Sequence, residues 1–160
     1  MTTTYFYNTV EAAVISLIRA QMASYFPTPE ETVTQSDDTH LDSGHDYFVI
    51  AYPGALPTEY FAGQMVLTNW EVILDAMIRW NDSQPNAWTA FKQLRGELFY
   101  LFNVRNIGRT LGGASWVDQV FMSADDRPRY IPMNPGDVES DPAFIAQALS
   151  LTVTQKINRA

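Results

Sequence analysis

The feature that most constrains this 160-residue chain is residues 64–80, QMVLTNWEVILDAMIRW, because two periodicities fit it. Helical spacing gives one apolar face, made of Trp70, Ile73, Leu74, Met77 and Ile78. Strand spacing gives another, because only Thr68 is polar among the even-numbered residues from 66 to 80. A helix would spread those even-numbered residues around all of its sides. We therefore interpret residues 64–80 as one long strand.

The odd-numbered face of this strand mixes charged, polar and apolar side chains. It consists of Asn69, Glu71, Ile73, Asp75, Met77 and Arg79. Such a mixture suits contact with a neighbouring subunit, since protein interfaces combine an apolar centre with polar groups. An ordinary outer sheet face has a similar composition, so both interpretations stay open. We treat these six residues as a candidate subunit or partner interface.

Two other stretches have helical periodicity. Residues 8–24 carry an apolar stripe, and Asn8 stands where an N-cap is expected. Residues 84–102 carry a broader apolar stripe. Gly96 lies inside that second helix at a cost of about 1 kcal/mol relative to alanine, which suggests close packing there.

Several further segments predict strands, because they alternate or are rich in β-branched and aromatic residues: 31–34, 46–54, 116–125, 129–133 and 143–159. The intervening segments are polar or rich in Gly and Pro and are expected to be mainly loops: 28–45, 55–64, 104–115 and 125–142. The order of elements predicts a single α+β domain over residues 1–160. We expect a mostly antiparallel sheet packed against two helices, 8–24 and 84–102.

Composition excludes several classes of chemistry. The chain has no cysteine, which excludes disulfides, zinc–thiolate sites and cysteine nucleophiles. Its formal net charge of −8 opposes tight general binding to nucleic acid and to anionic membrane surfaces. No basic signal region opens the sequence, and no apolar run approaches the length of a membrane span, about 20 residues. We expect no membrane partner.

The best candidate for a metal site is HLDSGH, because His40, Asp42 and His45 could bring two imidazoles and a carboxylate to one ion. Its spacing matches no strong metal-binding pattern, so a solvated polar loop is the preferred interpretation. Residues 137–141, DVESD, resemble the start of a calcium loop, but Pro142 replaces the required glycine. We predict no catalytic, cofactor-binding or metal-binding residue.

The four tryptophans lie on apolar faces of the expected elements: Trp70, Trp80, Trp88 and Trp116. A platform for stacking bases or sugars would place them beside cations or on exposed loops. The chain is acidic, so we predict that all four belong to the core.

Four features of the chain follow one another in a recognisable order. An amphipathic helix, VEAAVISLIRAQ, comes first, and a short apolar strand, DYFVIAYPG, then leads through a polar excursion into the long alternating strand. A central helix begins with NDSQPNAW. The loop SADDRPRY precedes the terminal alternating strand AQALSLTVTQKI. Over nearly all of the chain this layout resembles the tail terminator proteins of long-tailed bacteriophages, also called minor tail or tail completion proteins.

The resemblance implies a structural protein and not an enzyme, with no cofactor. Such proteins form rings, typically homo-hexamers, that bind the end of the completed tail tube and stop its polymerisation. The implied partners are further copies of the chain, the tail tube protein and the head–tail connector protein. The implied location is the head-proximal end of the tail in the virion, after assembly in the host cytoplasm. DNA would pass through the bore of the ring without specific binding.

The loops are the expected places of contact with tube or connector, because long polar loops on a compact sheet often carry function. Arg127 and Arg129 are candidate partners for a neighbour's carboxylates, since a guanidinium group can pair with a carboxylate through two hydrogen bonds. Solvation at the surface is the alternative for both arginines.

Three alternatives to a tail terminator stay open. The first is a head–tail connector or neck protein of the same particle. The second is a small metal-dependent hydrolase that uses His40, Asp42 and His45. The third is a monomeric binding module that its net charge steers to a basic partner.

Overall fold

The computed structural model describes residues 3–35, 44–80, 86–124, 126–132 and 142–158. Their elements, in chain order, are α1 (Thr3–Gln21), α2 (Pro29–Thr32), β1 (Val33–Gln35), β2 (Tyr47–Pro53), β3 (Thr58–Ala62), β4 (Met65–Arg79), α3 (Ala87–Asn103), α4 (Asn106–Arg109), β5 (Val117–Ser123), β6 (Arg129–Pro132) and β7 (Pro142–Asn158). The fold is α+β, and its seven strands form one mostly antiparallel sheet. The predicted fold class is confirmed at this level.

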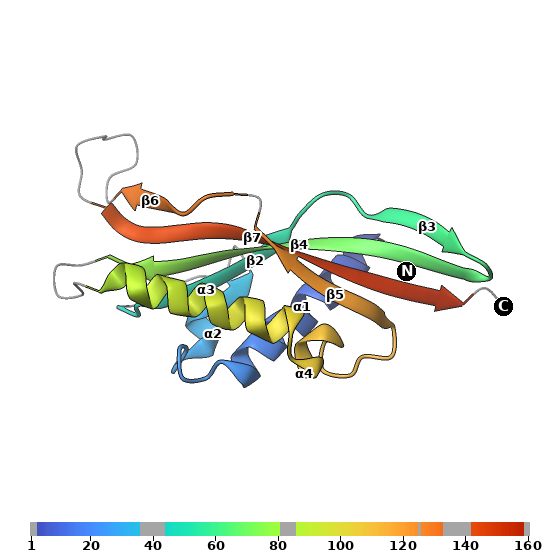
Figure 1. Ribbon diagram of the computed structural model, residues 1–160, viewed down its shortest axis with the longest axis horizontal. Coiled ribbons are helices and arrows are strands. Elements are labelled where there is room, and N and C mark those ends of the chain that lie inside the picture. The colour runs from blue at the N-terminus through green and yellow to red at the C-terminus, as the bar shows by residue number, and fades with distance from the viewer. Residues whose placement is uncertain (1–2, 36–43, 81–85, 125, 133–141, 159–160) are drawn as a thin grey trace.

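The ambiguous stretch is a strand, as its alternation predicts. β4 pairs with β7 along its whole length, from Met65 beside Asn158 to Arg79 beside Phe144. The two strands form the centre of the sheet (Figure 1). On the side of β4 away from β7, β3 pairs with the first part of β4 and β2 with the second part. On the side of β7 away from β4, β6 pairs with the first part of β7 and β5 with the second part. Among the strands of the described residues, only the β1–β2 pair is parallel.

The two long helices cover one face of this sheet. α1 contacts β1, β2 and β4, whereas α3 contacts β4, β5 and β7. The even-numbered side chains of β4 point to this face and are buried: Trp70, Val72, Leu74, Ala76 and Ile78. They pack with the apolar stripes of α1 and α3 in one core, which is why two helices of modest intrinsic stability hold their positions.

Several predicted boundaries are wrong. α1 begins at Thr3, so Asn8 lies inside the helix and cannot be an N-cap, which requires non-helical backbone. The helix also ends at Gln21 and not at residue 24. The central helix, predicted over 84–102, runs from Ala87 to Asn103, and residues 84 and 85 lie outside the described residues. Residues 104–115 contain a helical turn, α4, where only a loop was expected.

Two strands near the edge of the sheet also differ from the prediction. The short strand expected at 31–34 is β1, Val33–Gln35, and residues before it form α2. The segment expected to be a connection contains β3, which forms a hairpin with β4. Its turn is made by Gly63, whose φ of +64° is a conformation that glycine adopts without strain.

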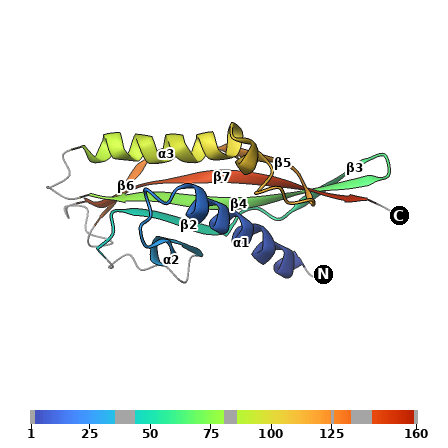
Figure 2. The same cartoon turned by 90° about the horizontal axis from the view of Figure 1, so that it is seen from below.

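One end of the sheet extends beyond the helices. We call this part the arm: the β3–β4 hairpin, residues 58–69, and the end of β7, residues 154–158. Figures 1 and 2 both show the arm projecting past α3 and α4. All five residues of β3 are exposed. We call the remainder of the sheet, with its helices, the body.

Candidate functional site

The odd-numbered residues of β4 face away from both helices. Asp75 and Met77 are buried on this face, and Asn69, Glu71, Ile73 and Arg79 are half-buried. Neither α1 nor α3 covers them, so their burial within the described part of the chain comes from neighbours on the same face of the sheet. The candidate interface is therefore a face whose side chains already interact within the chain.

An apolar cluster occupies the end of this face nearest Arg79. Phe48, Met77, Phe144 and Ala146 are its buried members. The rings of Phe48 and Phe144 meet edge to face, with centroids 5.9 Å apart. The Arg79 guanidinium lies 5.8 Å from the Phe48 centroid and 5.1 Å from that of Phe144, which are cation–π distances. Arg79 thus caps a small second core.

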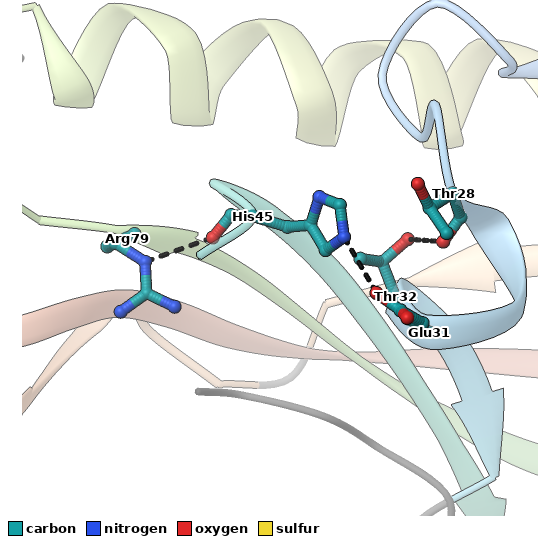
Figure 3. A network of polar contacts seen from close by, with 5 residues as sticks. All are labelled: Thr28, Glu31, Thr32, His45 and Arg79. Carbon is teal, nitrogen blue, oxygen red and sulfur yellow. Dashed lines mark hydrogen bonds and ion pairs between the residues drawn. The ribbon is translucent and has the colours of Figure 1, made fainter. Parts of the chain in front are cut away.

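A chain of polar contacts connects Arg79 with α2. Figure 3 shows His45 between Arg79 and Glu31, with its carbonyl toward the first and its ring toward the second. Arg79 Nε donates to the His45 carbonyl at 3.0 Å, and His45 Nε2 lies 2.8 Å from Glu31 Oε2. His40 and Asp42, the other members of the suggested metal site, lie outside the described residues. His45 therefore links β4 to α2, through Arg79 on the strand and Glu31 on the helix.

Asp75 and Arg129 form an ion pair across the sheet. Arg129 donates through one terminal nitrogen to Asp75 Oδ2 at 2.9 Å. The Asp75 side chain is largely buried, whereas Arg129 is partly exposed. Among the described residues, Asp75 Oδ1 has no hydrogen-bond partner. Burial raises the pKa of Tyr52, and the negative charge of Asp75 raises it further.

Glu71 is held by groups on both of its sides. Ser150 Oγ donates to Glu71 Oε1 at 2.7 Å, and the backbone N–H of Ala55 donates to Oε2 at 2.7 Å. These bonds stabilise the charged form, so the pKa of Glu71 lies below its ordinary value, the hydroxyl of Ser150 being the larger cause. A Cβ at Gly54 would lie 2.6 Å from Glu71 Cγ, so this arrangement requires glycine there.

The structure brings together only part of the predicted set. Arg129 meets Asp75, and Asn69 Oδ1 accepts a hydrogen bond from Thr154 Oγ1 at 2.7 Å. Arg127 is exposed, and its backbone N–H donates to the Asp126 side chain at 2.8 Å. The six residues of β4 share one face, as predicted. Whether that face binds another subunit stays a prediction.

The tryptophans take the structural positions that were predicted. Trp70 is buried, and the other three are half-buried against the core. Trp70 Nε1 donates to Gln155 Oε1 at 3.0 Å, and Trp88 Nε1 donates to Tyr130 Oη at 2.9 Å. The indole N–H groups of Trp70 and Trp88 are thus both bonded within the chain.

A groove that sequence reasoning missed lies between α3 and the end of β5. It measures about 340 Å³ and is lined mainly by apolar atoms, from Gly96, Phe99, Met122 and Leu149 among others. Lys92 and Arg95 also line it. Arg95 donates to Gln147 Oε1 at 3.1 Å, whereas Lys92 is exposed. Gly96 in the middle of a helix was the one signal in the sequence that could have indicated this groove.

The described residues contain no group of three or more His, Cys, Asp or Glu side chains that could hold a metal ion. Residues 137–141, which resembled the start of a calcium loop, lie outside that description. Among the helices of the described residues, none is both long and apolar enough to cross a membrane. No protein-family model matches this chain, and a search of curated proteins found no match.

Proposed function

We propose that this chain is a phage tail terminator: a structural protein that closes into a ring on the completed tail tube, stops tube polymerisation and provides the head-joining surface. The observation that carries the proposal is the arm. β4 and β7 extend past the helices and expose a hairpin at one end, whereas Glu71 and Asp75 on the odd face of β4 form hydrogen bonds within the body. The surface left for a partner is at the end of the molecule.

The order of the elements supports the same proposal. An N-terminal helix, a short apolar strand, a long central strand, a central helix and a long terminal strand follow one another as in the family that the sequence resembles. The layout also places the two long strands side by side. A ring built from such subunits can present one edge to the tube and another to the connector.

The mechanism is binding and not catalysis. One face of the ring fits the last ring of tube subunits, and the opposite face offers no template for another. The net charge of −8 on each copy disfavours strong attachment to the DNA that would pass through the bore. Assembly would take place in the host cytoplasm, and the ring would remain at the head-proximal end of the tail in the virion.

The test is native mass spectrometry with negative-stain imaging, on the chain alone and with tubes assembled from the tail tube protein. We expect a closed ring of about six copies, alone or seated on tube ends, and tubes that stop growing. A chain that stays monomeric and leaves tube ends bare would refute the proposal and favour the binding-module alternative. Rings that bind heads but never tube ends would favour a connector.

A further inference from the structure

The arm carries an exposed aromatic residue beside a carboxylate. Phe61 is 63% exposed, and Glu59, two residues earlier on β3, is exposed too. They pair with Val66 and Thr68, which are even-numbered residues of β4. Cross-strand partners lie on the same face of a sheet. Phe61 and Glu59 therefore project together from the helix side of the arm, one apolar and the other negative.

The groove beside α3 has the complementary character. Its lining is mainly apolar and includes two cations, Lys92 and Arg95. The chain has only 10 Lys and Arg residues, so two at one groove give it a locally positive charge. Gly96 borders it, and a Cβ built there meets no heavy atom within 4 Å. Close packing within the chain, which the sequence suggested, does not account for this glycine. As part of the groove lining, this glycine leaves space that an incoming group can occupy.

The arm cannot reach the groove of its own chain. Phe61 lies beside Val66, and Leu149 of the groove lies beside Leu74. Val66 and Leu74 are eight residues apart on β4, which is about 26 Å of extended strand. Contact between the two surfaces must therefore join different molecules. Because the surfaces are different patches, the contact is head-to-tail, which generates rings when the rotation closes.

We propose that the arm of one copy docks in the α3–β5 groove of the next, with Phe61 in the apolar groove and Glu59 beside Lys92. Two copies that each carry −8 repel one another, so their contact needs locally opposite charges, and this pairing supplies them. The occupant is thus a second copy of this chain. The inference rests on the proposed function for the closed ring, and names the contact that closes it.

The sharpest test is Gly96→Leu, which places a large side chain at the groove. Leucine is a better helix residue than glycine, so the folded monomer should be at least as stable as the wild type. We expect self-association to weaken roughly tenfold or more, because the leucine side chain would occupy the space that Phe61 of the next copy enters. Gln93→Leu is the matched control, since Gln93 is exposed on the same helix but does not line the groove. Equal ring formation by both variants would overturn the inference.

The arm side is tested by Phe61→Ser against Tyr60→Ser. Tyr60 is the neighbouring exposed aromatic residue, but it pairs with Leu67 and lies on the opposite face. Only Phe61→Ser should weaken association. The charge pair is tested by Glu59→Lys and Lys92→Glu, each of which should weaken association, whereas the double variant should restore it. Loss in the double variant equal to the sum of both single losses would exclude this pairing.

Cross-linking shows which surfaces meet. The chain has no cysteine, so engineered thiols react without background. A mixture of Ile157→Cys and Ala124→Cys chains, treated with a short bis-maleimide, should give a mixed dimer. Ile157 is an exposed residue of the arm that pairs with Val66, on the same face as Phe61, and Ala124 lines the groove. Ile157→Cys with Ser16→Cys, an exposed position on α1, is the control. Rings without selective cross-linking would refute this contact alone, whereas absence of both rings and tube binding would refute the proposed function.

Discussion

The body and the arm are built on the same two strands, yet they differ in what their side chains do. In the body, Glu71 and Asp75 on β4 accept hydrogen bonds from Ser150 and Arg129, and the even-numbered residues fill the core. In the arm, the adjoining strand β3 is exposed throughout. Charged side chains of β4 thus stabilise the fold in the body, whereas β3 in the arm presents exposed side chains that a partner can contact. The comparison predicts that equivalent substitutions will affect stability in the body and assembly in the arm.

The largest effect on stability is expected in the body core, at Leu74. Its side chain is fully buried beneath the helices, so Leu74→Ala should lower the free energy of unfolding by about 2–5 kcal/mol. Urea denaturation followed by circular dichroism measures the change. Leu67→Ala, on the half-buried odd face of the arm, is the matched control and should cost much less. Equal losses at both positions would remove the distinction between body and arm.

The second effect is expected at the Asp75–Arg129 pair. Arg129→Met would leave the largely buried Asp75 carboxylate without the cation it now contacts. Because Arg129 is itself partly exposed, we expect a loss of about 1–2 kcal/mol and not the full penalty of a buried broken pair. The double variant with Asp75→Asn should recover part of that loss in a double-mutant cycle. A cycle with no coupling energy would show that the pair does not stabilise the body.

Much of the fold follows from the sequence because its longest pattern is local. The alternation of β4 persists over the whole strand, and the apolar stripes of α1 and α3 fit helices. The β3 strand was missed because Pro57 and Gly63 favour a turn, whereas the strand between them is stabilised by pairing with β4. Its existence depends on a partner strand more than on its own composition.

The site was less predictable, because its contacts depend on register. Asp75 and Arg129 are 54 residues apart in the chain and meet only because β4 and β6 both pair with β7. Gly108 and Gly96 also differ in a way that only the folded structure reveals. A Cβ at Gly108 would lie 1.7 Å from the Leu101 carbonyl oxygen, whereas one at Gly96 meets nothing within 4 Å. Sequence alone treats the two glycines alike, although one permits close packing and the other leaves a groove open.

A third, smaller effect concerns pH and Glu71. Its pKa is lowered in the folded protein, so its contribution to stability is present above its ordinary value of 4.5 and is lost as the pH falls through the lowered pKa. We expect Glu71→Gln to be about 1 kcal/mol less stable than the wild type at pH 7. The difference should shrink in acid, as urea denaturation at several pH values would show. Parallel pH profiles for the two proteins would contradict the assigned hydrogen bonds.

The smallest effect on stability is expected at the tip of the arm. Phe61 is mostly exposed, and exposed substitutions away from special features usually change stability by less than about 0.5 kcal/mol. Phe61→Ser should therefore unfold at nearly the urea concentration of the wild type. A chain that keeps a large aromatic side chain in solvent gains little from it as a monomer. If Phe61→Ser instead unfolds as easily as Leu74→Ala, the arm belongs to the core of the single chain, and its exposed face is no longer an argument for assembly.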